Sequence, residues 1–133
     1  EAALAREAVT EFGIKCQPRQ KISQLSGGNQ QKAVIARTML AMPDIVILDE
    51  PTRGIDVGSK AQIYQLIGRL AAEGRAVIVV SSYLPELLGL CDTIGVMCRG
   101  ELVAVRPRSE WNEAEIMRVA TGGGDAAAGR REG

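Results

Sequence analysis

The 133-residue chain has the size of one domain, and its composition of 46% hydrophobic and 24% charged residues is that of a folded protein. This balance excludes a disordered or collagen-like chain. Sixteen basic side chains match sixteen acidic ones, so the net charge is zero. A neutral chain has no broad positive field for DNA or RNA, and we expect no nucleic-acid partner. Histidine is absent from the sequence, which removes every imidazole base and every zinc site that uses one.

The three cysteines, Cys16, Cys91 and Cys98, share no spacing typical of a metal site. We expect them to be reduced and mostly buried, as in a cytosolic protein. No apolar run approaches the ~18 residues of a membrane-spanning helix, and no signal peptide opens the chain. Because the chain starts inside a helical pattern without a methionine, we expect it to be part of a longer protein.

Apolar residues alternate between helical spacing and continuous runs, which predicts an α/β fold with a parallel sheet. Strands buried on both faces are expected over residues 45–48 and 76–80, and a hairpin over 93–98 and 102–105. Residues 122–133 are rich in Gly, Ala and charged side chains, and we expect a disordered tail there. Helices are expected over residues 2–12, 29–41, 59–73, 84–90 and 109–120, with Ser26 and Ser109 as N-caps.

The apolar run over residues 45–48 ends in two adjacent carboxylates, Asp49 and Glu50. The carboxyl end of a buried parallel strand is where open α/β sheets bind their ligands. In nucleoside-triphosphatases with a phosphate-binding loop, such an aspartate helps to hold Mg²⁺, and a second carboxylate can polarise the attacking water. Adjacent carboxylates repel each other, so the pair needs a cation or a raised pKa on one member. A plain acidic turn after a strand is the alternative.

A second signal is the Ser26-Gly27-Gly28 triplet that precedes a predicted helix. Two glycines at a helix start let a polyphosphate approach the backbone closely. The free N–H groups and the positive end of the helix favour an anion there, and the Ser26 hydroxyl can add a donor. Taken alone, most such triplets are ordinary loops.

Together, the two segments resemble the motifs of the ATP-binding cassette (ABC) ATPases. Residues 25–30 resemble the signature motif, and residues 45–50 resemble the Walker B strand with its catalytic glutamate. Residues 51–56 occupy the position of the D-loop. The amino-acid sequences of these segments, and of residues 80–87, are similar to those of the second cassette in ribose-, xylose- and galactose-type sugar importers. The resemblance extends from about residue 9 to residue 120.

The resemblance implies that residues 1–121 are the C-terminal portion of a P-loop NTPase domain, with a parallel sheet flanked by helices and a C-terminal hairpin and helix. It implies ATP and Mg²⁺ as cofactors, with Glu50 as the catalytic residue and Asp49 on the metal ion. The implied D-loop residues are Arg53, Gly54, Ile55 and Asp56. The residues implied to contact an ATP held by a partner cassette are Leu25, Ser26, Gly27, Gly28, Asn29 and Gln30.

The implied partners are a second cassette, fused or separate, a membrane permease and, indirectly, a periplasmic sugar-binding protein. The implied location is the cytoplasmic face of the bacterial cell membrane, as a peripheral subunit. Two alternatives remain: a soluble ABC protein outside transport, and an interaction domain that needs no nucleotide. The sequence does not name the sugar.

Two departures from the family pattern bear on activity. The phosphate-binding loop (Walker A) is absent, because the glycine spacing of residues 54–60 is wrong and Ala61 stands where a metal-binding hydroxyl belongs. The position of the family's switch histidine is occupied by Ser82. We therefore expect the signature to serve the partner's ATP site, this cassette's own site to be weak or silent, and the chain alone to be inactive.

The remaining polar and aromatic residues have plainer interpretations. We expect a solvated first helical turn formed by Gln30, Gln31 and Lys32. The functional alternative is that Gln30 lies beside the sugar of the nucleotide. Tyr83 is expected to serve local packing, and Trp111 is expected to pack as a cover over the small C-terminal element.

Overall fold

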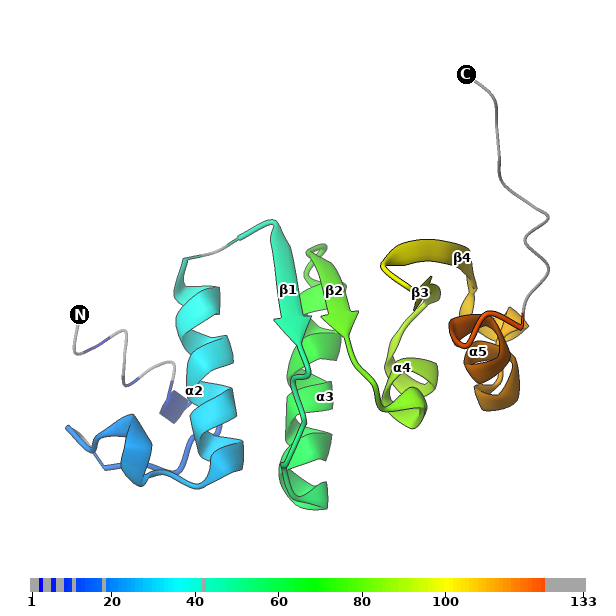
Figure 1. The fold of residues 1–133 in the computed structure, drawn as a ribbon. Coiled ribbons are helices and arrows are strands. Elements are labelled where there is room, and N and C mark those ends of the chain that lie inside the picture. The colour runs from blue at the N-terminus through cyan, green and yellow to red at the C-terminus, as the bar shows by residue number, and fades with distance from the viewer. Residues whose placement is uncertain are drawn as a thin grey trace. The chain divides into compact units, whose positions relative to one another are not determined.

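The computed structural model describes residues 3, 6, 9, 10, 12–17, 19–41 and 43–123. The chain divides into two compact units, Glu1–Val80 and Ser81–Gly133 (Figure 1). Most of the helix predicted over residues 2–12, and most of the predicted tail, lie outside the described residues. Within the part of the chain that is described, no helix combines the length and the apolar sequence that a membrane crossing requires.

The first unit consists of helices packed beside two strands. Its elements in chain order are η1 (Ile22–Gln24), α2 (Gly27–Leu40), β1 (Ile45–Asp49), α3 (Val57–Ala72) and β2 (Ala76–Val80). Helix α2 begins two residues earlier than predicted, and Ser26 is its N-cap as predicted. On its inner face α2 buries Ile35, Ala36 and Met39.

The strands β1 and β2 are parallel, with Ile47 opposite Ile78 and Asp49 opposite Val80. Helix α3 connects them and packs against β2 (Figure 1). The prediction that both strands are buried on both faces is wrong. In β1 the buried residues alternate with exposed ones, and Ile45 and Ile47 are 61% and 66% exposed. The physical reason is that, among the described residues, only one face of the pair is covered.

Helix α3 begins at Val57, two residues before its predicted start, because Asp56 caps it. The Asp56 carboxylate accepts a hydrogen bond from the Ser59 N–H at 2.9 Å. At the other end Gly74, with φ 85°, lets the Arg75 N–H donate back to Leu70 O at 3.2 Å. The predicted apolar stripe is confirmed, since α3 buries Ile63, Leu66, Ile67 and Leu70.

The second unit contains the predicted hairpin. Its elements in chain order are α4 (Leu84–Leu90), β3 (Thr93–Cys98), β4 (Glu101–Pro107), η2 (Arg108–Glu110) and α5 (Glu113–Ala120). The strands β3 and β4 pair in antiparallel fashion around Arg99 and Gly100, which both have positive φ. Two consecutive left-handed residues are what a tight two-residue hairpin turn requires.

Helix α5 begins at Glu113 and not at Ser109, so the predicted N-cap is wrong. Asn112 is the N-cap, and its side-chain oxygen accepts the Glu115 N–H at 2.9 Å, while Ser109 lies in the short helix η2. Trp111 packs locally as predicted: it is 7% exposed, and its Nε1 donates to Ile94 O at 3.2 Å.

The three cysteines are free thiols. Each is half-buried, where the sequence predicted mostly buried side chains. Burial, together with nearby carboxylates, raises the pKa of the Cys91 thiol.

Candidate functional site

The first turn of α2 presents hydrogen-bond donors without helical acceptors. The first bond of the helix runs from the Gln30 N–H to Ser26 O at 2.8 Å. The N–H groups of Gly27, Gly28 and Asn29 therefore have no carbonyl to pair with in the preceding turn. The Ser26 side chain does not cap them either, since it makes no hydrogen bond to the helix backbone. Such an arrangement favours an anion.

Two side-chain amides brace this turn from within the chain. Asn29 Nδ2 donates to Ser26 Oγ at 3.0 Å, and Asn29 Oδ1 accepts the Lys15 N–H at 3.1 Å. Gln30 Nε2 donates to Leu25 O at 2.9 Å. Both amides therefore hold the shape of the loop before α2.

The two signature glycines face the segment after β1. A Cβ on Gly28 would lie 2.3 Å from Ser59 Oγ, whereas a Cβ on Gly27 would lie 3.5 Å from Ile55 Cδ1. The structure therefore brings the predicted signature and D-loop residues together within one unit. It also gives Gly28 a role that sequence reasoning missed, because its missing side chain is what lets α2 approach α3.

Lys32 is buried, which corrects the prediction of a solvated turn. Its side chain is 4% exposed, and Nζ donates to Gly13 O at 3.0 Å and to Gln62 Oε1 at 2.7 Å. Burial lowers the pKa of Lys32, the charge of Lys15 lowers it further, and the Asp56 carboxylate acts in the opposite direction. The ammonium thus ties α2 to α3 and to the loop that precedes the signature.

The predicted Walker B carboxylates lie at the end of β1. Asp49 is exposed, and Glu50 is half-buried with a left-handed backbone at φ 47°. The Glu50 N–H donates to Val80 O at 2.7 Å, so pairing with β2 continues one residue beyond β1. Among the described residues, no group of three or more His, Cys, Asp or Glu side chains is arranged to hold a metal ion.

The predicted D-loop forms the turn that leads into α3. Arg53 and Gly54 are exposed, and Gly54 has φ 71°. Ile55 is half-buried, and the Ser59 N–H holds the pKa of Asp56 below its usual range. Ser82 belongs to the second unit, where it is exposed.

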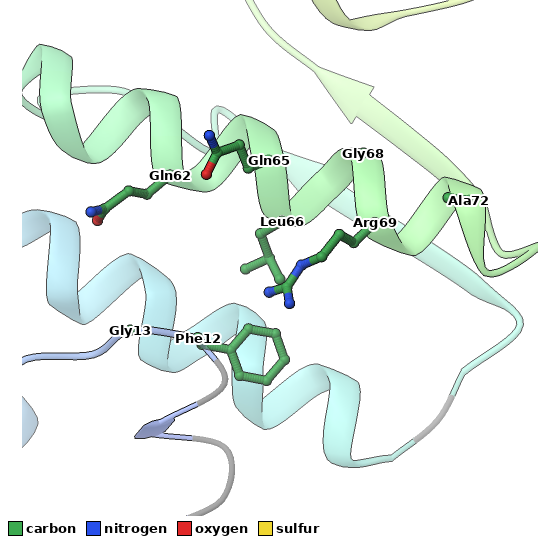
Figure 2. A pocket seen from close by; sticks show the side chains of 8 residues that line it. All are labelled: Phe12, Gly13, Gln62, Gln65, Leu66, Gly68, Arg69 and Ala72. Carbon is green, nitrogen blue, oxygen red and sulfur yellow. The ribbon is translucent and has the colours of Figure 1, made fainter.

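A groove of about 690 Å³ lies along α3, away from the predicted motifs (Figure 2). The Arg69 guanidinium stands over the Phe12 ring there, 5.8 Å from its centre. None of the residues predicted to contact ATP lines this groove, so it is not the candidate site. Its lining residues are Phe12, Gly13, Gln62, Gln65, Leu66, Gly68, Arg69 and Ala72.

The chain is similar in sequence to curated ATP-binding proteins of importers. It is 49% identical over 124 residues to a ribose import ATP-binding protein of Shouchella clausii, covering 92% of this chain and 25% of that protein. It is 58% identical over 104 residues to a putative ribose/galactose/methyl galactoside import ATP-binding protein of Geobacillus kaustophilus, covering 78% of this chain and 21% of that protein. The chain thus spans about a quarter of the length of the relatives it matches.

Solved structures agree on the fold. A nucleotide-free ATP-binding cassette of an ABC transporter matches with a TM-score of 0.73 at 24% identity, covering 88% of this chain and 45% of that one. The dimeric structure of a bacterial ABC transporter cassette matches with a TM-score of 0.68 at 28% identity, covering 80% and 46%. The family model described as ABC transporter matches residues 1–53. The predicted α/β fold is therefore confirmed as part of a cassette, and the chain belongs to the ABC transporter ATP-binding family.

Proposed function

We propose that this chain is the signature-bearing part of an ATP-hydrolysing subunit that drives import of a monosaccharide across the cytoplasmic membrane. One observation carries the proposal: the first turn of α2 offers N–H donors that have no helical partner, next to the exposed Ser26 hydroxyl. The relatives in sequence are named as ribose or galactoside import ATP-binding proteins, which supports the sugar class.

In this proposal the donors of α2 complete an ATP site whose phosphate-binding loop belongs to a partner cassette. The Ser26 hydroxyl and the N–H groups of Gly27 and Gly28 face the γ-phosphate, and Leu25, Asn29 and Gln30 shape the loop around them. A helix start and free hydroxyl stabilise phosphate charge without a full positive charge of their own. A related cassette has been solved as a dimer, which supports a paired arrangement.

The carboxylates at the end of β1 belong to this cassette's own site. Their donor set fits Mg²⁺, which prefers oxygen ligands and commonly takes one or two carboxylates together with phosphate oxygens and water. Asp49 would hold the ion, which when bound neutralises charge on the phosphates. Glu50 accepts a proton from the attacking water. Serine at position 82 cannot carry a proton as an imidazole does, so this second site is weak or silent.

The proposed partners are a second cassette, a membrane permease and, through the permease, a periplasmic sugar-binding protein. The subunit is peripheral to the membrane, on the cytoplasmic side. A soluble ABC protein outside transport and a nucleotide-independent interaction domain have less support, because the relatives are named for import. Residues 1–121 form the C-terminal portion of the cassette, followed by a tail.

The proposal is tested with the full-length subunit reconstituted with its permease, by measuring ATP turnover and sugar uptake. Ser26→Arg should abolish most turnover, because it replaces a donor hydroxyl with bulk at the competent site. Glu50→Gln should reduce turnover much less, because it acts on the silent site. Equal losses from both variants would contradict the division between the sites, and turnover without sugar uptake would contradict import. The 133-residue chain alone should not hydrolyse ATP, since it lacks a phosphate-binding loop.

A further inference from the structure

Asn29 occupies a place between the loop before α2 and the Ser26 hydroxyl. Its Oδ1 accepts the Lys15 N–H at 3.1 Å, and its Nδ2 donates to Ser26 Oγ at 3.0 Å. A backbone N–H can only donate, so the amide oxygen must face Lys15. The orientation of the amide is therefore fixed by chemistry, and the NH₂ group must face Ser26.

This orientation decides what the Ser26 hydroxyl can do. A serine hydroxyl has one hydrogen to donate and two lone pairs that accept. The Asn29 NH₂ group occupies a lone pair, so the hydroxyl hydrogen is turned away from Asn29. Among the described residues, no acceptor takes up that hydrogen, and Ser26 is exposed. The hydroxyl therefore acts as a donor to a ligand at the helix start.

We propose that Asn29 is a positioning residue that makes Ser26 a hydrogen-bond donor toward the bound phosphate, a role that rests on the proposed function. The Lys15 backbone anchors the amide, and the Lys32 ammonium anchors the neighbouring carbonyl of Gly13 at 3.0 Å. The loop before the signature thereby determines that the hydrogen of the Ser26 hydroxyl, and not a lone pair, faces the nucleotide. In this role the Asn29 side chain acts through Ser26 and not through a nucleotide contact of its own.

The substitution Asn29→Asp tests this directly in the full-length subunit with its permease. A carboxylate still accepts the Lys15 N–H, but its second oxygen now accepts from Ser26 and turns the hydroxyl hydrogen inward. The loop keeps its shape while the donor toward phosphate is lost. Because a hydrogen bond to a charged group is at stake, kcat/KM for ATP should fall about tenfold to a hundredfold. Nucleotide-driven pairing of the cassettes, measured by sedimentation with a non-hydrolysable ATP analogue, should weaken by a similar factor.

The decisive control is the same substitution in a Ser26→Ala background. With no hydroxyl to orient, Asn29→Asp should there lower kcat/KM by less than about threefold, so the two substitutions are strongly non-additive. Gln31→Glu is the matched control, since it also converts an amide into a carboxylate on the first turns of α2. It should leave kcat/KM and pairing nearly unchanged.

The outcomes separate the inference from the function on which it rests. If Asn29→Asp lowers kcat/KM equally in both backgrounds, the added charge or a structural change is responsible, and the positioning role is wrong. A fall in the thermal midpoint of the nucleotide-free subunit with Asn29→Asp would also overturn it. If Ser26→Ala alone changes neither turnover nor pairing, the proposed ATP contact at the signature fails.

Discussion

The close approach of α2 to α3 at Gly28 predicts an unusual sensitivity to one methyl group. Gly28→Ala would place a Cβ 2.3 Å from Ser59 Oγ and 2.5 Å from Ser59 Cβ, distances at which a neighbour must move. Forcing an extra carbon into a packed contact costs about 1–3 kcal/mol. Alanine regains at most about 1 kcal/mol through its better helix propensity. We expect a net loss of about 1–2 kcal/mol in the free energy of unfolding.

The neighbouring glycine is the matched control. A Cβ on Gly27 would meet Ile55 Cδ1 at 3.5 Å, an ordinary van der Waals contact. Gly27→Ala should therefore leave the stability unchanged or raise it slightly. Thermal unfolding of the full-length subunit without nucleotide measures both variants, and Gly28→Ala should lower the midpoint by a few degrees.

Second-site substitutions at Ser59 test whether the clash with this side chain causes the loss of stability in Gly28→Ala. Ser59→Gly removes the two atoms that the new Cβ would clash with, Oγ at 2.3 Å and Cβ at 2.5 Å, and keeps the N–H that donates to Asp56, so it should rescue Gly28→Ala. Ser59→Ala keeps the Cβ at 2.5 Å and should not rescue it. If Gly28→Ala is harmless, or if both second-site changes rescue it equally, the steric account of this glycine is wrong.

Three further predictions concern stability, each measured by thermal unfolding of the full-length subunit. Asp56→Ala should lower the midpoint, and Asp56→Asn should lower it less, because the amide oxygen can still accept the Ser59 N–H. Because the pKa of Asp56 is lowered in the fold, the advantage of Asp56 over Ala should hold at neutral pH and shrink as pH falls below about 4 through that lowered value. Lys32→Met should cost about 1–3 kcal/mol by leaving two acceptors unpaired, and Gln62→Leu added to it should recover part of that loss. Trp111→Phe should cost about 1 kcal/mol, since it removes the Nε1 hydrogen bond to a backbone carbonyl; no loss would mean that this bond is not formed.

Local sequence patterns predicted the helices and strands well where a regular apolar spacing or a clear turn signal marks the element. The period of the apolar residues located the buried stripe of α3, and a left-handed turn at Arg99 and Gly100 closed the hairpin where the pattern placed it. Helix starts were less predictable, because Ser109 and Asn112 are both good N-caps. Only the bond from the Glu115 N–H to Asn112 decides between them.

The environment of the candidate site could not be predicted from local patterns. Lys32 was predicted to be solvated because lysine usually is. It is buried instead, and its ammonium donates to two acceptors from distant segments, Gly13 O and Gln62 Oε1. Its spacing, four residues after Gly28 and three before Ile35, places it on the inner face of α2 and could have signalled burial. The apolar run in β1 is compatible with burial on both faces of the strand. It does not tell which segments of the protein cover each face, and the described residues cover only one.

The left-handed backbone at Glu50 restricts this position before any chemistry begins. A residue with φ 47° bears a conformational cost that glycine escapes and that a β-branched side chain makes worse. Glutamine has the same branching as glutamate and leaves this backbone as it is. Glycine would relax the turn after β1, and valine would strain it. A comparison of side chains at position 50 therefore separates proton transfer from backbone shape only when glutamine is the replacement.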